Sequence, residues 1–205
     1  AKIAGVEYDT RTGYQVLQDL KSSGVNAVPA VSPPDTNATP SSESLLPLAG
    51  VSNKTTVLCN ESGKYAIFQS DRYGFNNPDA EWDSPQTEWV LTGDSFTQGS
   101  CVQLGEDIAG QLRLITGKNV LNLGIGGNGP LSEIGVLKEY AAFRKPKKVA
   151  WIYFEANDMF DLTREISVPL LVNYLRSGFS QNLIHRQVEI DSYINKYIIN
   201  PYIEA

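Results

Sequence analysis

Three short apolar runs between Glu88 and Asp158 each end in a polar or glycine-rich cluster, and stretches of helical periodicity separate them. The apolar runs are residues 89–92, 119–124 and 149–154, and the helical stretches are 106–116 and 131–143. Strands that alternate with helices favour a parallel sheet with right-handed crossovers. We therefore predict an α/β fold, in which the continuous apolar run 149–154 forms a strand that is covered on both faces.

The helical stretches carry further expectations. In 106–116, Ile108, Leu112 and Ile115 share one apolar face, and Gly117 is a natural helix stop. Residues 166–176 and 183–199 also have helical periodicity, and no further strand is evident after residue 154.

The first 85 residues differ from the rest because they are rich in loop-forming residues. A short helix is predicted near 13–23, and the Pro- and Ser-rich stretch from Pro29 to Pro47 predicts an extended, mostly exposed connector. Residues 55–60 and 64–69 flank a turn in which Gly63 can adopt a positive φ, which predicts a β-hairpin. We therefore expect an N-terminal extension over 1–85, followed by a domain over 86–205.

Charge and composition remove several functional classes. The chain has 205 residues and a formal net charge of −6, and a nucleic-acid-binding protein is more often basic. No apolar run is long enough to span a membrane, and no leader with the pattern of a signal peptide is visible. The glycine-rich loop 124–129 does not match a phosphate-binding loop, so a nucleotide-binding domain is disfavoured.

The two cysteines, Cys59 and Cys101, leave two interpretations open. They could form a disulfide in an oxidising compartment, or they could be two buried free thiols. No Cys-x-x-Cys motif and no Cys/His cluster is present, so we expect no structural zinc site.

The polar clusters 93–95, 124–129 and 155–158 fall at the carboxyl ends of the predicted strands, where the loops of parallel sheets bind ligands. Each cluster also has a plain structural interpretation, as a turn, a loop or a helix cap. A serine on a strand-to-helix turn can present its Oγ as a nucleophile. Backbone N–H groups of glycine and a side-chain amide can hold an oxyanion.

Taken together, Gly-Asp-Ser-Phe-Thr-Gln-Gly (93–99), Asn-Leu-Gly-Ile-Gly-Gly-Asn-Gly (122–129) and Glu-Ala-Asn-Asp (155–158) resemble three blocks of the SGNH (GDSL) hydrolase superfamily. The resemblance covers about residues 88–158. The preceding Ser-Asp-Arg-Tyr-Gly-Phe-Asn-Asn-Pro (70–78) resembles the lead-in of a bacterial subset associated with exported polysaccharide or lipid modification. This resemblance implies a flavodoxin-like three-layer α/β/α fold that cleaves or transfers acyl or acetyl esters without a metal or organic cofactor.

The resemblance also assigns roles to individual residues. Ser95 matches the nucleophile, and its N–H is the first oxyanion donor. Gly127 matches the second donor, with Gly126 as the alternative, and Asn157 matches the third. Asp94 matches an aspartate that supports the turn. The family pattern in the third block is Gly-x-Asn-Asp, and Glu155 stands here at the glycine position. A carboxylate at that place opposes an oxyanion unless it points away.

The family's Asp-x-x-His block is absent from this sequence. Its single histidine, His185, lies in a helical segment only 28 residues after Asn157, and we do not expect it to be the catalytic base. One reading is that the chain, which opens with Ala1 instead of Met, is a fragment whose last strand and histidine lie beyond Ala205. The other is a scaffold that has lost catalysis.

The sequence thus predicts a serine ester hydrolase or acyltransferase that acts through Ser95 on an ester, such as one of a saccharide or a lipid. The alternative is a catalytically inactive accessory subunit of a larger, membrane-associated complex, with the 1–85 extension contacting a protein partner. The lead-in and the paired cysteines favour a periplasmic or exported protein.

Overall fold

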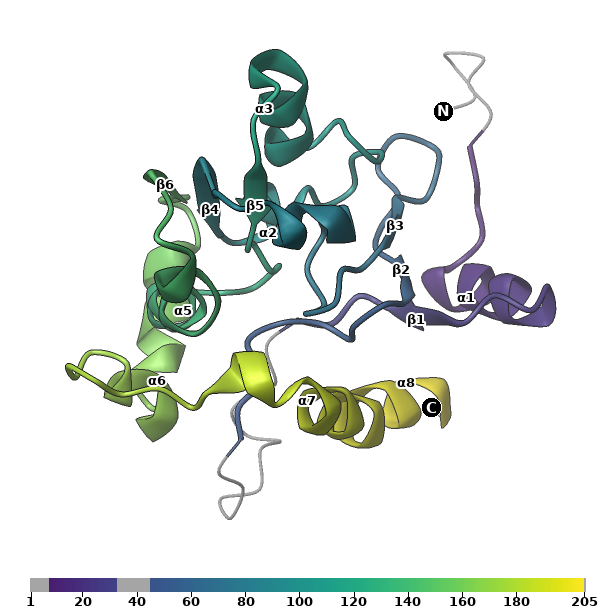
Figure 1. The fold of residues 1–205 in the computed structure, drawn as a ribbon. Coiled ribbons are helices and arrows are strands. Elements are labelled where there is room, and N and C mark those ends of the chain that lie inside the picture. Colours follow the sequence, from purple (N-terminus) through teal and green to yellow (C-terminus); the bar gives the residue numbers. More distant parts are fainter. Residues whose placement is uncertain (1–7, 33–44, 205) are drawn as a thin grey trace.

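The computed structural model describes residues 8–32 and 45–204 and contains two small sheets (Figure 1). In the first sheet, β1 (Ala27–Pro29) runs parallel to β2 (Thr55–Val57), which pairs antiparallel with β3 (Ile67–Gln69). In the second sheet, β4 (Trp89–Gly93) lies between β5 (Val120–Asn122) and β6 (Lys148–Ile152), and all three strands are parallel. The predicted α/β class is confirmed.

Eight α-helices are found in the described part of the chain: α1 (Gly13–Ser22), α2 (Ser95–Gln98), α3 (Ile108–Thr116), α4 (Pro130–Val136), α5 (Asp158–Glu165), α6 (Pro169–Asn173), α7 (Gln187–Ile194) and α8 (Asn200–Glu204). The π-helical turn Leu137–Ala141 continues α4, and a second one, Asn195–Ile199, joins α7 to α8. Short 3-10 turns span Asp79–Asp83, Ala142–Arg144 and Leu183–His185.

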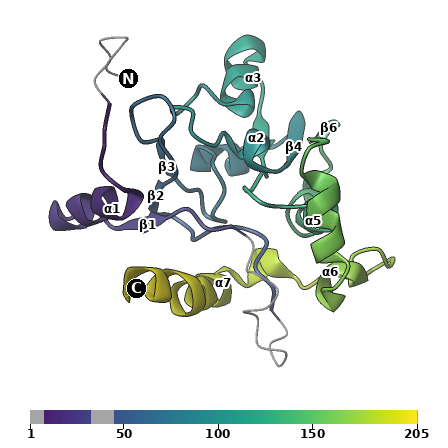
Figure 2. The ribbon, with the colours of Figure 1, turned by 180° about the vertical axis from the view of Figure 1, so that it is seen from behind.

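Helices cover both faces of the parallel sheet (Figures 1 and 2). On one face, Ala109 of α3 packs in an apolar cluster with Leu91 and Val120. On the other face, Val136 of α4 belongs to the large core cluster that also contains Val90. The sheet around β4 is therefore the middle layer of a helix–sheet–helix arrangement.

The hairpin and the first helix are confirmed. Strands β2 and β3 pair from Thr55↔Gln69 to Val57↔Ile67, and Gly63 in the connecting loop has a φ of 101°. Helix α1 begins after a reciprocal cap in which Thr12 and Gln15 each bond the other's backbone N–H.

The prediction that the strand 149–154 is covered on both faces is wrong. β6 is an edge strand that pairs only with β4 in the described part of the chain, and Val149 and Trp151 are each 49% exposed. A continuous apolar run identifies a strand, but it does not tell whether that strand lies in the middle or at the edge of its sheet.

Helix α3 also differs from its predicted apolar face. It ends at Gly117 in the left-handed conformation, as expected, but Ile108 and Ile115 are exposed. Ala109 is buried instead, and Leu112 is partly buried against the same cluster. The side of the helix that meets the sheet is therefore set by the small Ala109, which allows close approach, and not by the larger isoleucines.

The stretch 29–47 is only partly an exposed connector. Residues 33–44 lie outside the described part of the structure. Pro29 belongs to β1, and Leu45 and Leu46 are buried in the core, where the Leu46 N–H donates to Gln181 Oε1 at 2.9 Å. The prediction of exposure is wrong for these last residues, because the connector returns through the core.

One core joins the first 85 residues to the rest. Its cluster contains Phe75 and Trp82 together with Val90 and Leu121. Within the described residues, no helix combines the length and the apolar character needed to cross a membrane.

Candidate active site

The three polar clusters meet at one edge of the parallel sheet, because β4, β5 and β6 run in the same direction. β4 leads through Asp94 into α2, β5 leads into the loop 124–129, and β6 leads through residues 153–157 into α5. The carboxyl ends of the strands thus bring together segments that are far apart in the sequence.

Two glycines allow the segments to approach closely. A Cβ on Gly93 would lie 2.1 Å from Thr97 Oγ1 and 2.7 Å from the carbonyl oxygen of Ile152. A Cβ on Gly124 would lie 2.5 Å from the backbone nitrogen of Gln98. Because any side chain at these positions would collide with backbone, both glycines are required for the loops to pack against α2.

Ser95 is the first residue of α2 and is partly exposed at the strand-to-helix turn. Its Oγ lies 3.5 Å from Asp94 Oδ2. The other carboxylate oxygen of Asp94 accepts a hydrogen bond from the Phe96 N–H at 3.0 Å and so caps α2. Asp94 itself is buried, so its hydrogen bonds fix the backbone of the turn that carries Ser95.

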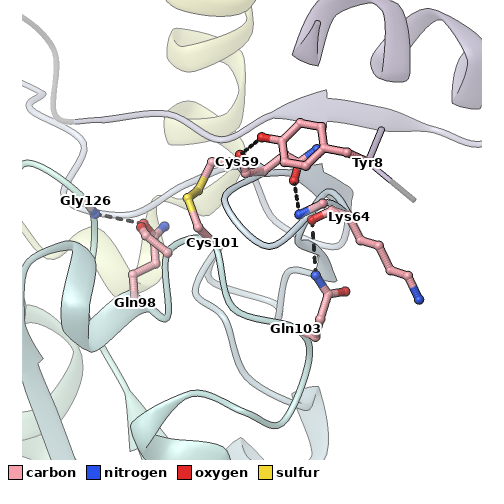
Figure 3. Close-up of a disulfide and its surroundings, with 10 residues drawn as sticks. Tyr8, Cys59, Lys64, Gln98, Cys101, Gln103 and Gly126 are labelled. Atoms are coloured by element: carbon pink, nitrogen blue, oxygen red, sulfur yellow. Dashed lines mark hydrogen bonds between the residues drawn. A yellow bond between two sulfur atoms is a disulfide. The ribbon is translucent and has the colours of Figure 1, made fainter. Parts of the chain in front are cut away.

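The glycine loop distinguishes Gly126 from Gly127. The Gly126 N–H donates to Gln98 Oε1 at 2.9 Å (Figure 3), and a Cβ on Gly126 would lie 3.6 Å from Ser95 Cβ. Gly127 is exposed with a φ of 87°. Among residues 8–32 and 45–204, neither the Gly127 N–H nor the Ser95 N–H has a hydrogen-bond partner. These two N–H groups are therefore available to an oxygen atom of a ligand.

Asn157 lies beside Asp94, but its amide is engaged within the protein. Nδ2 donates to Asp94 Oδ2 and to Asp161 Oδ2, each at 3.1 Å. Its Oδ1 is buried and has no partner in the described structure. Asn157 thus joins the third cluster to the first, while both of its N–H donors face carboxylates.

Neither Glu155 nor His185 has a hydrogen bond to Ser95, Asp94 or Asn157 in the described part of the chain. Glu155 is exposed on the turn before α5. His185 ends the 3-10 turn that precedes α7, and its side chain is exposed.

The sequence analysis missed a group of buried carboxylates near the Ser95 turn, formed by Glu133, Asp158, Glu165 and Asp94. Burial raises the pKa of Glu133 to about 8, and the nearby charges of Asp158, Glu165 and Asp94 add to this effect. Its Oε2 accepts a hydrogen bond from the indole N–H of Trp151, while Oε1 has no partner. Burial likewise raises the pKa of Asp158. The available signal was the pair of glutamates, Glu133 and Glu139, among the apolar residues of the predicted helix 131–143.

Asp71 in the lead-in segment 70–78 holds a second buried network, which the sequence analysis did not predict. Its carboxylate accepts four hydrogen bonds, from the N–H groups of Tyr73 and Phe75 and from the side chains of Asn77 and Trp82. Burial raises the pKa of Asp71, and the four donors oppose that shift.

The network of Asp71 reaches the second cluster through Asn77. Asn77 Nδ2 also donates to the carbonyl oxygen of Asn122, and Asn77 Oδ1 accepts from the Asn122 N–H at 2.8 Å. Asn76 Nδ2 in turn donates to the carbonyl oxygen of Gln98 at the end of α2. The lead-in therefore positions both β5 and α2.

A disulfide between Cys59 and Cys101 connects the hairpin β2–β3 to the loop that follows α2 (Figure 3). Gln103 Nε2 adds a hydrogen bond to the carbonyl oxygen of Lys64 in the hairpin. Of the two interpretations of the cysteines, the disulfide is the one found, and it restrains the chain only six positions after Ser95.

Among the described residues, no three His, Cys, Asp or Glu side chains are grouped so that they could hold a metal ion. Comparisons of the chain with protein-family models, with curated proteins and with solved structures give no match.

Proposed function

We propose that the protein is a serine ester hydrolase or acyltransferase of the SGNH type, with a flavodoxin-like fold, and that Ser95 is its nucleophile. Two observations support this proposal best: the partly exposed Ser95 lies against the 124–129 loop, where a Cβ on Gly126 would be 3.6 Å from Ser95 Cβ, and the N–H groups of Ser95 and Gly127 have no partner among the described residues. Two such donors beside a nucleophile are what an acyl-transfer site needs to hold the oxyanion of a tetrahedral intermediate.

In the proposed reaction, Ser95 Oγ forms a bond to the ester carbonyl carbon while its proton passes to a base. The carbonyl oxygen becomes an oxyanion held by the N–H groups of Ser95 and Gly127. The C–O bond to the alcohol then breaks, and the alcohol leaves with the proton. Water or an acceptor hydroxyl releases the acyl group from Ser95.

Among the described residues, no histidine is hydrogen-bonded to Ser95, and His185 is exposed on the turn before α7. We therefore place the base outside the described residues of the chain. The Cys59–Cys101 disulfide supports a protein that folds in an oxidising compartment, as a periplasmic or exported protein does.

Labelling with a fluorophosphonate probe tests the proposal. An activated Ser95 is expected to form a covalent adduct, located by peptide mass analysis, and Ser95→Ala is expected to abolish it. Ser100→Ala is the matched control, because Ser100 lies in the turn that directly follows α2 and is also partly exposed. If the wild-type protein in its native, unproteolysed form remains unlabelled, the enzymatic proposal is wrong.

A second candidate is a catalytically inactive accessory subunit with the same fold. The position of the Asn157 amide favours it, because both N–H donors are bonded to the carboxylates of Asp94 and Asp161. In that case the carboxylates of Asp94 and Asp161 would repel an oxyanion, and the turn at Ser95 would only connect the three polar clusters. Absence of labelling in a folded wild-type protein would support this candidate.

A further inference from the structure

Two exposed phenylalanines pack together next to the turn that carries the proposed nucleophile. Phe96 follows Ser95 directly in α2 and is 56% exposed, and Phe154 follows β6 and is 38% exposed. Their ring centroids are 4.6 Å apart and their planes are tilted by 54°. Exposed aromatic pairs of this kind are costly to leave in water, so a ligand surface is a natural reason for them.

Hydrogen bonds hold the backbone that carries each ring, and the two rings contact each other. The Phe96 N–H donates to Asp94 Oδ1, and the Phe154 N–H donates to Asp158 Oδ2 at 2.7 Å. The Phe154 carbonyl oxygen accepts from the Asp158 N–H at 3.1 Å. The bond from Asn157 to Asp94 connects the two turns. The apolar surface is therefore formed before any ligand binds, which lowers the entropic cost of binding.

The charge around this surface is negative. Glu155 is exposed next to Phe154. Asp94 and Asp158 are buried in the turns that carry the two rings. Within residues 8–32 and 45–204, no ion pair engages any of these three carboxylates. An anionic acyl group would be repelled here, whereas a neutral one would not.

The polar atoms near the rings are also engaged internally. Asp94, Asn157 and Asp158 direct hydrogen bonds to the turns that they hold, and their oxygens without a partner, Asn157 Oδ1 and Asp158 Oδ1, are buried. Few polar groups therefore remain beside the phenylalanines to bind the hydroxyl groups of a ligand. An apolar acyl chain needs no such polar groups.

We propose that Phe96 and Phe154 bind the acyl part of the ester, and that this acyl group is neutral, apolar and longer than an acetyl group. This inference rests on the proposed function, since it takes Ser95 as the nucleophile. The acyl chain lies against the two rings while the carbonyl oxygen reaches the N–H groups of Ser95 and Gly127.

Binding can be measured separately from catalysis in the Ser95→Ala variant of the full chain. Titration with methyl hexanoate, followed by NMR of the aromatic rings, is expected to show binding that weakens about tenfold in Phe96→Ala and in Phe154→Ala. Monomethyl succinate, which is anionic, is expected to shift no ring signals. Phe143→Ala is the matched control, because Phe143 is an exposed ring outside the site.

Catalysis is measured with the para-nitrophenyl esters of acetate and hexanoate. With Ser95 present, the Phe96→Ala and Phe154→Ala variants are expected to lower kcat/KM for the hexanoate about tenfold more than they lower kcat/KM for the acetate. An equal loss on both esters would overturn the inference, because it would place the rings in support of the turn and not of the acyl chain.

The outcomes separate this inference from the proposed function. Labelled Ser95 without any effect of the phenylalanine variants on hexanoate binding overturns the inference alone. Binding that depends on the phenylalanines in a protein whose Ser95 stays unlabelled supports the apolar surface and overturns the proposed reaction. The oligomeric state in solution gives a third outcome. If the wild type is a dimer and the variant with both Phe96→Ala and Phe154→Ala is a monomer, a second copy of the chain covers the rings, and the inference is overturned.

Discussion

The side-chain amide of Asn157 donates a hydrogen bond of 3.1 Å to Asp94, across 63 positions of the sequence. The same oxygen, Asp94 Oδ2, lies 3.5 Å from Ser95 Oγ. Asp94 therefore holds the turn after β6 against the turn after β4, and one buried carboxylate orients both clusters. Variants of these residues test how strongly the two turns depend on each other.

Asn157→Asp is expected to destabilise the protein at neutral pH, because it places a third carboxylate against Asp94 and Asp161. The loss should be on the order of 2 kcal/mol at pH 7 and should shrink as the pH falls and the introduced carboxyl group becomes protonated. Urea unfolding at pH 4.5 and 7.5 measures it. Asn182→Asp, at an exposed position, is the control. An equal loss at both pH values would contradict this account.

Glu133→Gln is expected to stabilise the protein at high pH. The pKa of Glu133 is raised from its ordinary 4.5 to about 8, so between these values the folded state binds more protons than the unfolded state. Stability of the wild type therefore falls as the pH rises through this window. The variant should be more stable above pH 8 by on the order of 3 kcal/mol.

Thermal or urea unfolding of Glu133→Gln at pH 5 and pH 8.5 tests that expectation. The glutamine can still accept the hydrogen bond from Trp151, so packing is preserved. Glu61→Gln, at an exposed position, should leave the pH dependence unchanged. Parallel pH curves for Glu133→Gln and the wild type would show that Glu133 is not protonated in the folded state near pH 7.

Asp71→Asn is expected to cost on the order of 3 kcal/mol of unfolding free energy. The asparagine N–H₂ would face donors of Asn77 and Trp82, which now bond one carboxylate oxygen. Tryptophan fluorescence in a denaturant titration, to which Trp82 contributes, measures the change. Asp83→Asn, whose side chain is exposed, is the control and should shift the midpoint little.

Removal of the disulfide by the double change Cys59→Ser and Cys101→Ser is expected to lower the unfolding free energy by about 2–4 kcal/mol, because a crosslink spanning 42 positions restricts the unfolded chain. Urea unfolding with and without a thiol reductant measures this. The reductant should act on the wild type and have no effect on the double variant. A wild type insensitive to the reductant, with no free thiol detected, would mean that the bond is not accessible or not limiting.

Local patterns were enough to predict the elements whose neighbours are close in sequence. The hairpin with Gly63, the helix that Thr12 caps and the stop at Gly117 depend on backbone preferences within a few residues. The order of strands and helices after Glu88 likewise predicted a parallel sheet and the meeting of the three clusters at its edge. The roles assigned to Ser95, Gly127 and Asn157 remain predictions that labelling will test.

What the tertiary structure decided depends on contacts between distant segments. Periodicity could not tell that β6 is an edge strand, because that depends on which strand lies beside it. It could not place the Asn157 amide on Asp94, nor distinguish the engaged Gly126 N–H from the unpartnered Gly127 N–H. The sequence by itself determined which backbone turns could form and which residues follow each strand. Only packing decided which donors, acceptors and rings face one another, because burial and hydrogen-bond geometry are properties of the folded chain.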